Sequence, residues 1–326
     1  MNHPRLRRLL MILGLGLSAL GATAQSPAPA ADPKTLKFIV PFPPGSGTDT
    51  SARYYARKVT ELTGQPVVVE NRAGANGFIA VRAVLSAPAD GATVFVGSNS
   101  TLAVNVALFK QLPYDPVGDF SPLSMLMRAP ALMIAPPQLP QTQLADFISA
   151  ARAQPGAFSY GSGSAGYQLM AELFNDAAKV QLMGVPFKGA SEAVTAVAAG
   201  TVQLAFAEMT SAQELVKSGR IRALAVASDK RSSVLPQVPT ASEAGLPGFV
   251  AYSWVAAAVN ARTPKEDTER LAALFTRIAN LPETREFYER IGAEVMRGGP
   301  QEMRAFQSNE IRLWKRIAAQ AKVEQQ

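Results

Sequence analysis

Residues 36–64, LKFIVPFPPGSGTDTSARYYARKVTELTG, decide the fold of this chain. The apolar run 36–40 is typical of a buried strand, and the prolines and glycines of 41–47 end it. Either Thr48 or Asp49 can then cap a helix, which we expect to end at Gly64 because glycine adopts the left-handed conformation without strain. The stretch therefore predicts a strand, a turn-rich loop and a helix in succession.

Two further strand–helix units follow this first one. We expect strands at 67–70 and 93–97, a helix after the turn-rich loop 71–77 that stops before Pro88, and a helical stretch near 102–108. Strands that alternate with helices in this way are typical of a parallel sheet with helices on both faces.

A second block repeats the alternation after an apolar extended run, 125–136, which we interpret as one crossover strand between the blocks. Strands and helices alternate within this block as they do in the first. We expect strands at 158–161, 185–188, 202–208 and 221–228, and helices at 166–178, 191–199 and 210–218.

The last third of the chain is expected to be helical, without strands. Thr263-Pro264-Lys265-Glu266 matches a capping box with proline at the first helical position. Helices are then expected up to 280, at 283–291 and at 301–322. We expect this block to pack back on the first sheet, which predicts an α/β protein of two lobes. Lobe 1 would comprise 33–128 plus 229–326, lobe 2 would comprise 129–228, and a cleft between them would open and close on a hinge.

The first two dozen residues have the features of an export signal. Arg5, Arg7 and Arg8 precede the apolar run 9–20, and small residues before the bond after Ala24 fit signal peptidase cleavage. The run is about 12 residues long, too short for the ~20 residues of a membrane-spanning helix. An uncleaved N-terminal anchor is the alternative interpretation. The sequence thus predicts signal peptide 1–24, a flexible leader up to Pro33 and a soluble periplasmic protein.

Composition restricts the chemistry. The 326 residues include no cysteine and a single histidine, His3, which lies in the expected signal peptide. Disulfides, thiolate nucleophiles, Ser-His-Asp triads and Cys or His metal sites are therefore excluded from the mature chain. The net charge of +7 falls to 29 − 25 = +4 without the three arginines of the signal peptide, so no nucleic-acid partner is indicated.

Two glycine motifs also fail to indicate catalysis or nucleotide binding. Gly189-Ala190-Ser191-Glu192-Ala193 ends in alanine and is therefore no nucleophile elbow. Gly45-Ser46-Gly47-Thr48 lacks the lysine of a phosphate-binding loop. We expect no enzyme, no metal and no cofactor.

Three loops rich in glycine and serine, at 43–49, 97–101 and 161–166, each follow an expected strand and precede a helix. Loops in this position line the ligand crevice of open α/β sheets. Unsatisfied backbone N–H groups and the helix dipole suit such loops to a carboxylate without any arginine. The alternative is that the loops only form tight turns. Asp49 could accept a hydrogen bond from a ligand or merely cap its helix.

Two further side chains have two interpretations each, and a third has one. Trp254 could form a wall of the cleft or pack in the core or hinge, and Trp314 is expected to be a packing residue. Lys188 could contact an acid or remain solvated at the end of its strand.

The same stretches make a family resemblance visible. The chain resembles the Bug-type, TctC-like extracytoplasmic receptors of tripartite tricarboxylate transporters along its whole mature length and in order. Departures from the family pattern are Phe187 where tyrosine is usual and Gln168 where many members have histidine, and they bear on the identity of the ligand. The matching segments are IVPFPPGSGTD (39–49), GQPVVVENRAGANG (64–77), LPYDPVGDF (112–120), YGSGSAG (160–166), VPFKG (185–189), IRALAVAS (221–228), PQVPTASEAGLPG (236–248), Trp254 and Thr263-Pro264.

The resemblance implies a two-lobed periplasmic binding protein of type II, with mixed, mainly parallel sheets flanked by helices. It also implies that the lobes close around a small organic carboxylate, that permease subunits receive the ligand, and that backbone and hydroxyl donors of 45–49 and 162–166 hold it. Residues 188–190 occupy the position of a further family motif. A monomer is expected. Two rival functions remain, a ligand sensor for a kinase and a hydrolase on the same lobes. The candidate site residues are Phe42, Gly45, Ser46, Gly47, Thr48, Asp49, Ser98, Asn99, Ser162, Gly163, Ser164, Ala165, Gly166, Lys188, Gly189, Ala190, Glu208 and Trp254.

Overall fold

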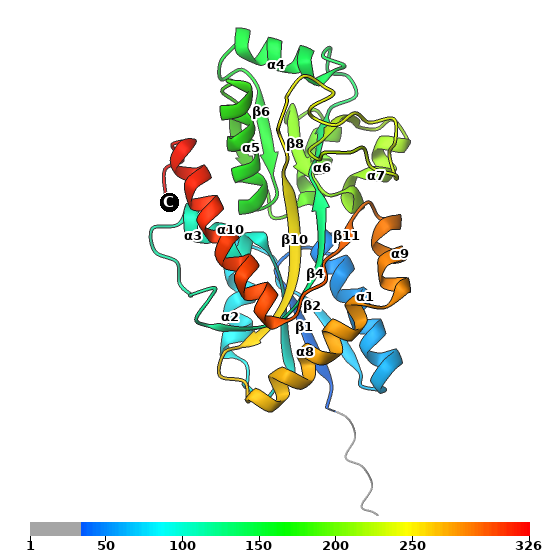
Figure 1. Ribbon diagram of the computed structural model, residues 1–326. Helices are drawn as coiled ribbons and strands as arrows, with labels where there is room; N and C mark the ends of the chain where they lie inside the picture. Colours follow the sequence, from blue (N-terminus) through cyan, green and yellow to red (C-terminus); the bar gives the residue numbers. More distant parts are fainter. Residues whose placement is uncertain (1–33) are drawn as a thin grey trace, which may run out of the picture. The chain divides into compact units, whose positions relative to one another are not determined.

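The computed structural model describes residues 34–326. The expected signal peptide 1–24 and the leader up to Pro33 lie outside the described residues. Two mixed sheets flanked by helices form two lobes (Figure 1). We call the six-stranded sheet with its helices lobe 1 and the five-stranded sheet with its helices lobe 2. Within the described part of the chain, no helix combines the length and the apolar character needed to cross a membrane.

Lobe 1 contains the first three strand–helix units and the C-terminal helices. Its strands are β1 (Leu36–Val40), β2 (Val67–Asn71), β3 (Thr93–Ser98), β4 (Phe120–Pro130), β10 (Tyr252–Asn260) and β11 (Glu294–Val295). Its helices are α1 (Gly47–Thr63), α2 (Phe78–Ser86), α3 (Asn105–Leu108), α8 (Lys265–Ala279), α9 (Pro282–Arg290) and α10 (Pro300–Gln320), with a short 3-10 helix at Ala75–Gly77 and a short π-helix at Ser100–Val104.

Lobe 2 is built from the second block of alternating elements. Its strands are β5 (Leu132–Ala135), β6 (Ser159–Ser162), β7 (Met183–Pro186), β8 (Leu204–Ala207) and β9 (Arg222–Val226). Its helices are α4 (Leu144–Ala153), α5 (Ala165–Ala178), α6 (Ala190–Ala198) and α7 (Met209–Lys217).

The strand orders are β11-β4-β10-β3-β1-β2 in lobe 1 and β7-β6-β8-β5-β9 in lobe 2. In each sheet the strands of the strand–helix units pair in parallel, β2-β1-β3 in lobe 1 and β7-β6-β8 in lobe 2. The remaining pairs are antiparallel, and they involve the strands on either side of the two chain crossings. Antiparallel pairing is therefore more extensive than the description "mainly parallel" implies. The reason is that β5 and β10, the first strands after the two crossings, run antiparallel to both of their neighbours.

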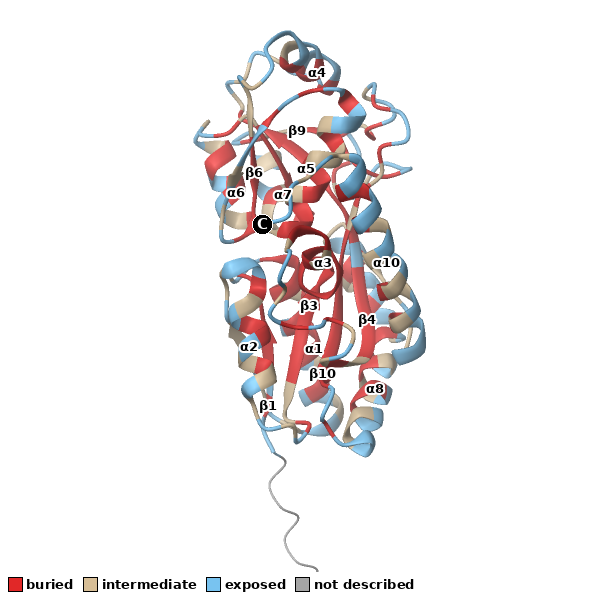
Figure 2. Ribbon diagram, turned by 90° about the vertical axis from the view of Figure 1, so that its left-hand side faces the viewer, coloured by how far each residue is buried: buried red, intermediate tan, exposed pale blue. Residues whose placement is uncertain are grey.

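Helices bury the faces of the first sheet. The ring of Phe275 from α8 packs on Phe38 of β1 and on Tyr55 of α1, with ring centroids 5.5 and 5.3 Å apart. On the opposite face α10 contributes Trp314 and Ile317 to a second buried cluster. The central strands of both sheets are buried, the edge strands β2 and β7 are partly exposed, and the outer sides of the helices are exposed (Figure 2). The C-terminal helices thus pack back on the first sheet, as the sequence predicts.

Two segments cross between the lobes and are hydrogen-bonded to each other where they cross. The Ala131 N–H donates to the Ala251 carbonyl (2.9 Å), the Ala227 N–H to the Ala131 carbonyl (2.8 Å), and the Ala251 N–H to the Ala227 carbonyl (3.0 Å). These are backbone contacts between small residues. This geometry suits a hinge, whose flexing residues lie at the ends of regular elements.

Four details differ from the sequence-based expectations. The run 125–136 is not one strand: Ala131 separates β4 from β5, which belong to different sheets. The helix α4 was not expected, and the C-terminal block contains the short strand β11. The helix α8 begins at Lys265, one residue after Pro264, and no side chain caps it, so the predicted capping box is wrong.

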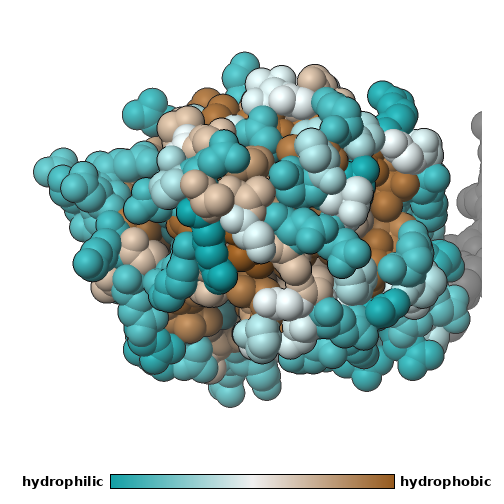
Figure 3. Space-filling model, turned by 90° about the horizontal axis from the view of Figure 1, so that it is seen from above, coloured by the Kyte–Doolittle hydropathy of each residue, from teal (hydrophilic) through white to brown (hydrophobic). Residues whose placement is uncertain are grey.

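Seen from the end of lobe 2, the surface is mainly hydrophilic with small separate hydrophobic patches (Figure 3).

Candidate functional site

The first glycine-serine loop connects β1 to α1 and is held from inside lobe 1. The N-cap of α1 is Ser46, whose Oγ accepts from the Asp49 N–H (3.2 Å), so neither Thr48 nor Asp49 is the cap. The buried carboxylate of Asp49 accepts hydrogen bonds from the Gly45 N–H (3.0 Å), from Asn71 Nδ2 (2.8 Å) and from Arg53 Nε (3.0 Å). Asp49 therefore fixes the loop, and its oxygens are fully engaged.

The second glycine-serine loop connects β6 to α5 in lobe 2. Ser164 is the N-cap of α5, and its Oγ accepts from the Tyr167 N–H (3.3 Å). In the first turn of this helix the Gly166 N–H donates to Ser100 Oγ, across the gap between the lobes, at 3.0 Å. This loop thus contacts the third one, after β3, where Thr101 Oγ1 accepts from the Ser98 N–H (3.2 Å). The three loops predicted from the sequence meet at one place.

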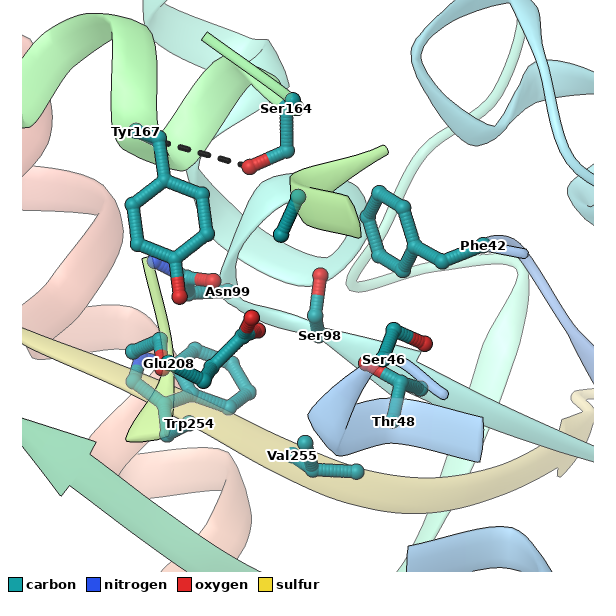
Figure 4. A pocket seen from close by; sticks show the side chains of 13 residues that line it. Phe42, Ser46, Thr48, Ser98, Asn99, Ser164, Tyr167, Glu208, Trp254 and Val255 are labelled. Atoms are coloured by element: carbon teal, nitrogen blue, oxygen red, sulfur yellow. Dashed lines mark hydrogen bonds between the residues drawn. The ribbon is translucent and has the colours of Figure 1, made fainter. Parts of the chain in front are cut away.

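A cavity lies where these loops meet (Figure 4). Its volume is about 20 Å³, room for roughly one water molecule. Both lobes contribute walls, from the starts of α1 and α5, the end of β8 and the strand β10. The lining residues are Phe42, Ser46, Thr48, Ser98, Asn99, Gly163, Ser164, Tyr167, Ala190, Glu208, Ser253, Trp254 and Val255.

Three polar groups in the cavity wall have no hydrogen-bond partner. They are Asn99 Nδ2, the Tyr167 hydroxyl and Glu208 Oε2, all buried. Buried polar atoms are usually paired, and leaving one unpaired costs about 1–3 kcal/mol. Figure 4 shows these three side chains close together on one side of the cavity. Unpaired donors and acceptors gathered in one cavity are typical of a ligand site.

The cavity contains one carboxyl group and no cationic side chain among its lining residues. Burial raises the pKa of Glu208 above its usual range. Burial and the neighbouring Glu208 carboxylate raise the pKa of Tyr167. The Tyr167 hydroxyl lies close enough to the Glu208 carboxyl to offset part of the rise in the pKa of Glu208, but neither Tyr167 Oη nor Glu208 Oε2 meets the geometry of a hydrogen bond. Helix starts rather than cations supply the positive potential, since α1 and α5 both begin here.

The structure places the predicted site residues in two groups. Most line the cavity directly, whereas the others support the loops from behind or lie at the lobe contact. In the cavity wall are Phe42, Ser46, Thr48, Ser98, Asn99, Gly163, Ser164, Ala190, Glu208 and Trp254. Outside it are Gly45, Gly47, Asp49, Ser162, Ala165, Gly166, Lys188 and Gly189.

Lys188 is exposed and belongs to a separate outer groove of about 390 Å³, which shares Phe42, Gly163 and Ser164 with the cavity. Its backbone N–H donates to Glu192 Oε2 (3.1 Å). The wall and packing interpretations of Trp254 both hold, because this side chain lines the cavity while its Nε1 donates to Glu310 on α10 (2.7 Å). Trp314 donates to the same carboxylate (3.0 Å).

The sequence analysis missed three lining residues, Tyr167, Ser253 and Val255. Tyr167 comes three residues after the helix cap Ser164, so its place in the first turn of α5 was a usable signal. Ser253 and Val255 flank Trp254, and only the register of β10 shows that this part of the strand reaches the cavity. Among the residues that the structure describes, no cluster of acidic or histidine side chains could hold a metal ion.

The fold and the cavity together define a class of protein, the two-lobed periplasmic binding proteins. Solved structures of the same shape include R. palustris Rpa4515 with adipate, at a TM-score of 0.86 and 34% identity, covering 90% of this chain and 98% of that one. The periplasmic binding protein BugD matches at 0.83 and 27%, covering 90% and 99%. MatC from Rhodopseudomonas palustris with bound malate matches at 0.81 and 32%, covering 87% and 98%.

The sequence comparison gives the family. Residues 51–323 match the model of TctC, the tripartite tricarboxylate transporter family receptor. BugT of Bordetella pertussis is 34% identical over 314 residues, which cover 94% of this chain and 95% of the relative. The chain belongs to the TctC family of solute-binding receptors. It is therefore a receptor and not an enzyme, and the alternative function as a hydrolase is wrong.

Proposed function

We propose that this protein is a periplasmic receptor that captures a small organic carboxylate between its two lobes and delivers it to the permease subunits of a tripartite tricarboxylate-type transporter. Two relatives of known structure are described with adipate and with malate, both carboxylates. The family to which the chain belongs is that of receptors for such transporters.

One observation carries the proposal for this chain. The starts of α1 and α5, from different lobes, meet at a cavity that contains unpaired polar groups and no lysine, arginine or histidine. A helix start provides free N–H groups and about half a positive charge, which suits a carboxylate. The serine and threonine hydroxyls of Ser46, Thr48 and Ser164 would add donors at the same two ends.

Entry of the ligand requires the lobes to separate. A cavity of about 20 Å³ does not accommodate a molecule such as adipate. The contacts that cross the gap include the hydrogen bond from Gly166 to Ser100, the packing of Gly189 on Pro43 and the approach of Glu208 to Gly47.

We therefore infer a hinge at the crossing around Ala131, near the expected lobe limits of 33–128 plus 229–326 and 129–228. The first limit moves to Ala131, because β4 continues to Pro130 in lobe 1. The second moves to about Ala251, because the segment before it pairs with β9 and packs on Phe174 and Phe206.

The candidate site residues named above remain part of this proposal. Those in the cavity wall would contact the ligand, and Gly45, Gly47, Asp49, Ser162, Ala165, Gly166 and Gly189 would shape the loops that hold it. Export with cleavage after Ala24 and a monomeric receptor also belong to it.

A ligand screen tests the binding function. Native mass spectrometry of the protein purified from periplasm, followed by a thermal-shift screen of mono-, di- and tricarboxylates, should identify stabilising acids. A ligand at 100 times its Kd stabilises the folded state by about 2.7 kcal/mol. Neutral sugars and simple amines serve as controls. Stabilisation by those controls and by no carboxylate would contradict the proposal.

Two measurements test closure and delivery. Small-angle scattering with saturating ligand should give a smaller radius of gyration than without it, and an unchanged radius would argue against a hinge. Crosslinking in membranes should capture permease subunits with the ligand-loaded receptor. Capture of a sensor kinase instead would assign the protein to signalling.

A further inference from the structure

Glu208 is a buried acid in a cavity that we assign to acids. It follows β8 and precedes α7, but its side chain does not cap that helix. The residue is 8% exposed, and its Oε2 has no partner. The carboxylate extends toward lobe 1, since its Oε1 lies 3.5 Å from the place where a Cβ on Gly47 would stand.

No positive side chain of the cavity wall balances this carboxylate. Tyr167 of α5 is the other titratable lining residue, and β10 contributes only Ser253, Trp254 and Val255. From α1 and the loop before it come Ser46 and Thr48, and from β3 and its loop come Ser98 and Asn99. Asp49, at the start of α1, is already held by Arg53, Asn71 and the Gly45 N–H.

Because of this arrangement, the site should bind two kinds of ligand with different affinities. A second carboxylate placed against Glu208 would bring two like charges together in a poorly solvated site, and one of them would have to take up a proton. A ligand that carries a hydrogen-bond donor there would instead form a charge-assisted hydrogen bond with Glu208 Oε2. An ammonium group would also neutralise the buried charge.

We propose that Glu208 selects the ligand of this receptor by accepting a hydrogen bond from a donor on the bound acid, so that its substrates are amino- or hydroxy-substituted carboxylates, the amino acids binding best. The proposal rests on the proposed function and deepens it. The helix starts of α1 and α5 would hold the carboxylate, and Glu208 would hold the donor.

Matched ligand sets test this selection without knowledge of ligand size. The sets are succinate, malate and aspartate, and adipate, 2-hydroxyadipate and 2-aminoadipate. In calorimetry at pH 7.5 the wild type should prefer the amino acid over the unsubstituted acid ten- to a hundredfold in at least one set, the change expected for one hydrogen bond to a charged group. The hydroxy acid should lie between them. If the hydroxy acid binds best, the preference for amino acids is wrong, and only the role of Glu208 as the acceptor of a ligand hydrogen bond stands.

Glu208→Gln should abolish the preference to within about threefold, by weakening the amino acid and strengthening the unsubstituted acid. Glu214→Gln, on the exposed side of α7, is the matched control and should keep the wild-type preference. Circular dichroism checks that both variants fold. A second arm needs no variant: on lowering the pH from 7.5 to 5, wild-type affinity should fall for the amino acid and rise for the unsubstituted acid.

The outcomes separate the two proposals. If carboxylates bind but unsubstituted acids bind the wild type as tightly as their amino analogues, or Glu208→Gln leaves the preference intact, this inference is wrong and the receptor function stands. If no carboxylate binds the wild type, both are overturned.

Discussion

Each lobe buries one carboxylate next to the candidate site, and the two are in opposite situations. Asp49 in lobe 1 is 3% exposed and accepts hydrogen bonds from a backbone N–H, an amide and a guanidinium. Glu208 in lobe 2 is 8% exposed, and its Oε2 has no partner. A buried charge without partners costs stability, so its presence calls for a function, whereas a paired one is explained by structure alone.

The two lobes also differ in the surroundings of one glycine in each glycine-serine loop, Gly47 in lobe 1 and Gly163 in lobe 2. A Cβ on Gly47 would meet the flexible ends of Met127 (2.9 Å) and Glu208 (3.4 Å). A Cβ on Gly163 would meet backbone, the Ala190 nitrogen at 2.3 Å and the Gly189 carbonyl carbon at 2.3 Å. Side-chain ends can move aside, but the start of α6 cannot move without displacing the loop. The loop of lobe 2 should therefore tolerate an added side-chain atom less well than the loop of lobe 1.

The largest expected effect comes from Gly163→Ala. The added Cβ forces the β6–α5 loop away from α6, so binding should weaken more than a hundredfold and stability should fall by about 3 kcal/mol, the upper end for overpacking. Gly47→Ala is the control in lobe 1. Its overpacking is offset by the gain from replacing glycine in a helix, about 0.5–1 kcal/mol, so its stability should stay near that of the wild type. If urea unfolding shows that Gly163→Ala and Gly47→Ala lose the same amount of stability, the two loops do not differ in this way.

Asp49→Asn should have the next largest effect. The amide keeps the shape but loses the charge, and its NH₂ faces one of three donors, so the free energy of unfolding should fall by about 1.5–3 kcal/mol. Ligand affinity should fall with it, because the loop before α1 is no longer fixed. Asp146→Asn, at an exposed position of α4, should leave both quantities unchanged. If Asp49→Asn lowers affinity but not stability, Asp49 contacts the ligand directly.

Glu208→Gln should act in the opposite direction and stabilise the protein. Burial raises the pKa of Glu208 from its ordinary value of 4.5, so the folded state binds the proton more tightly than the unfolded state. The wild type therefore has no penalty below pH 4.5 and loses stability as the pH rises through the folded-state pKa. Thermal unfolding should show the variant equal to the wild type at pH 4 and more stable by about 1–3 kcal/mol at pH 8. A variant less stable at pH 8 would mean that Glu208 is paired like Asp49.

Much of the fold could be predicted from the sequence, because glycine and proline mark the strand ends of both strand–helix blocks. The details that could not be predicted are set by tertiary context. Nothing in the run 125–136 shows that Ala131 separates two sheets, and β11 has only two residues, too few to show a period. Its pairing with β4 depends on where the chain returns in space.

Part of the cavity wall could also be predicted from the sequence. Loops at strand ends pointed to Ser98, Gly163 and Ser164, which do line the cavity. The role of Asp49 could not be predicted, since its partner Asn71 lies 22 residues away in sequence and meets it only through the pairing of β1 with β2. Tyr167 was missed because an aromatic residue on a helix is usually a core residue, although its place in the first turn of α5 was a usable signal.

The smallest expected effect is that of Lys188→Met. Lys188 lies in the VPFKG segment, and a point-charge mechanism would assign it the carboxylate. It is exposed, lies in the outer groove and does not line the cavity, where α1 and α5 begin instead. The contribution of an exposed charge is screened by solvent, so affinity should change less than about fivefold and stability by less than about 0.5 kcal/mol. Calorimetry at low and physiological ionic strength measures this, with Lys179→Met on the exposed end of α5 as the control. If Lys188→Met abolishes binding while folded Gly163→Ala protein still binds, a lysine clamp in lobe 2 holds the acid and the helix starts do not.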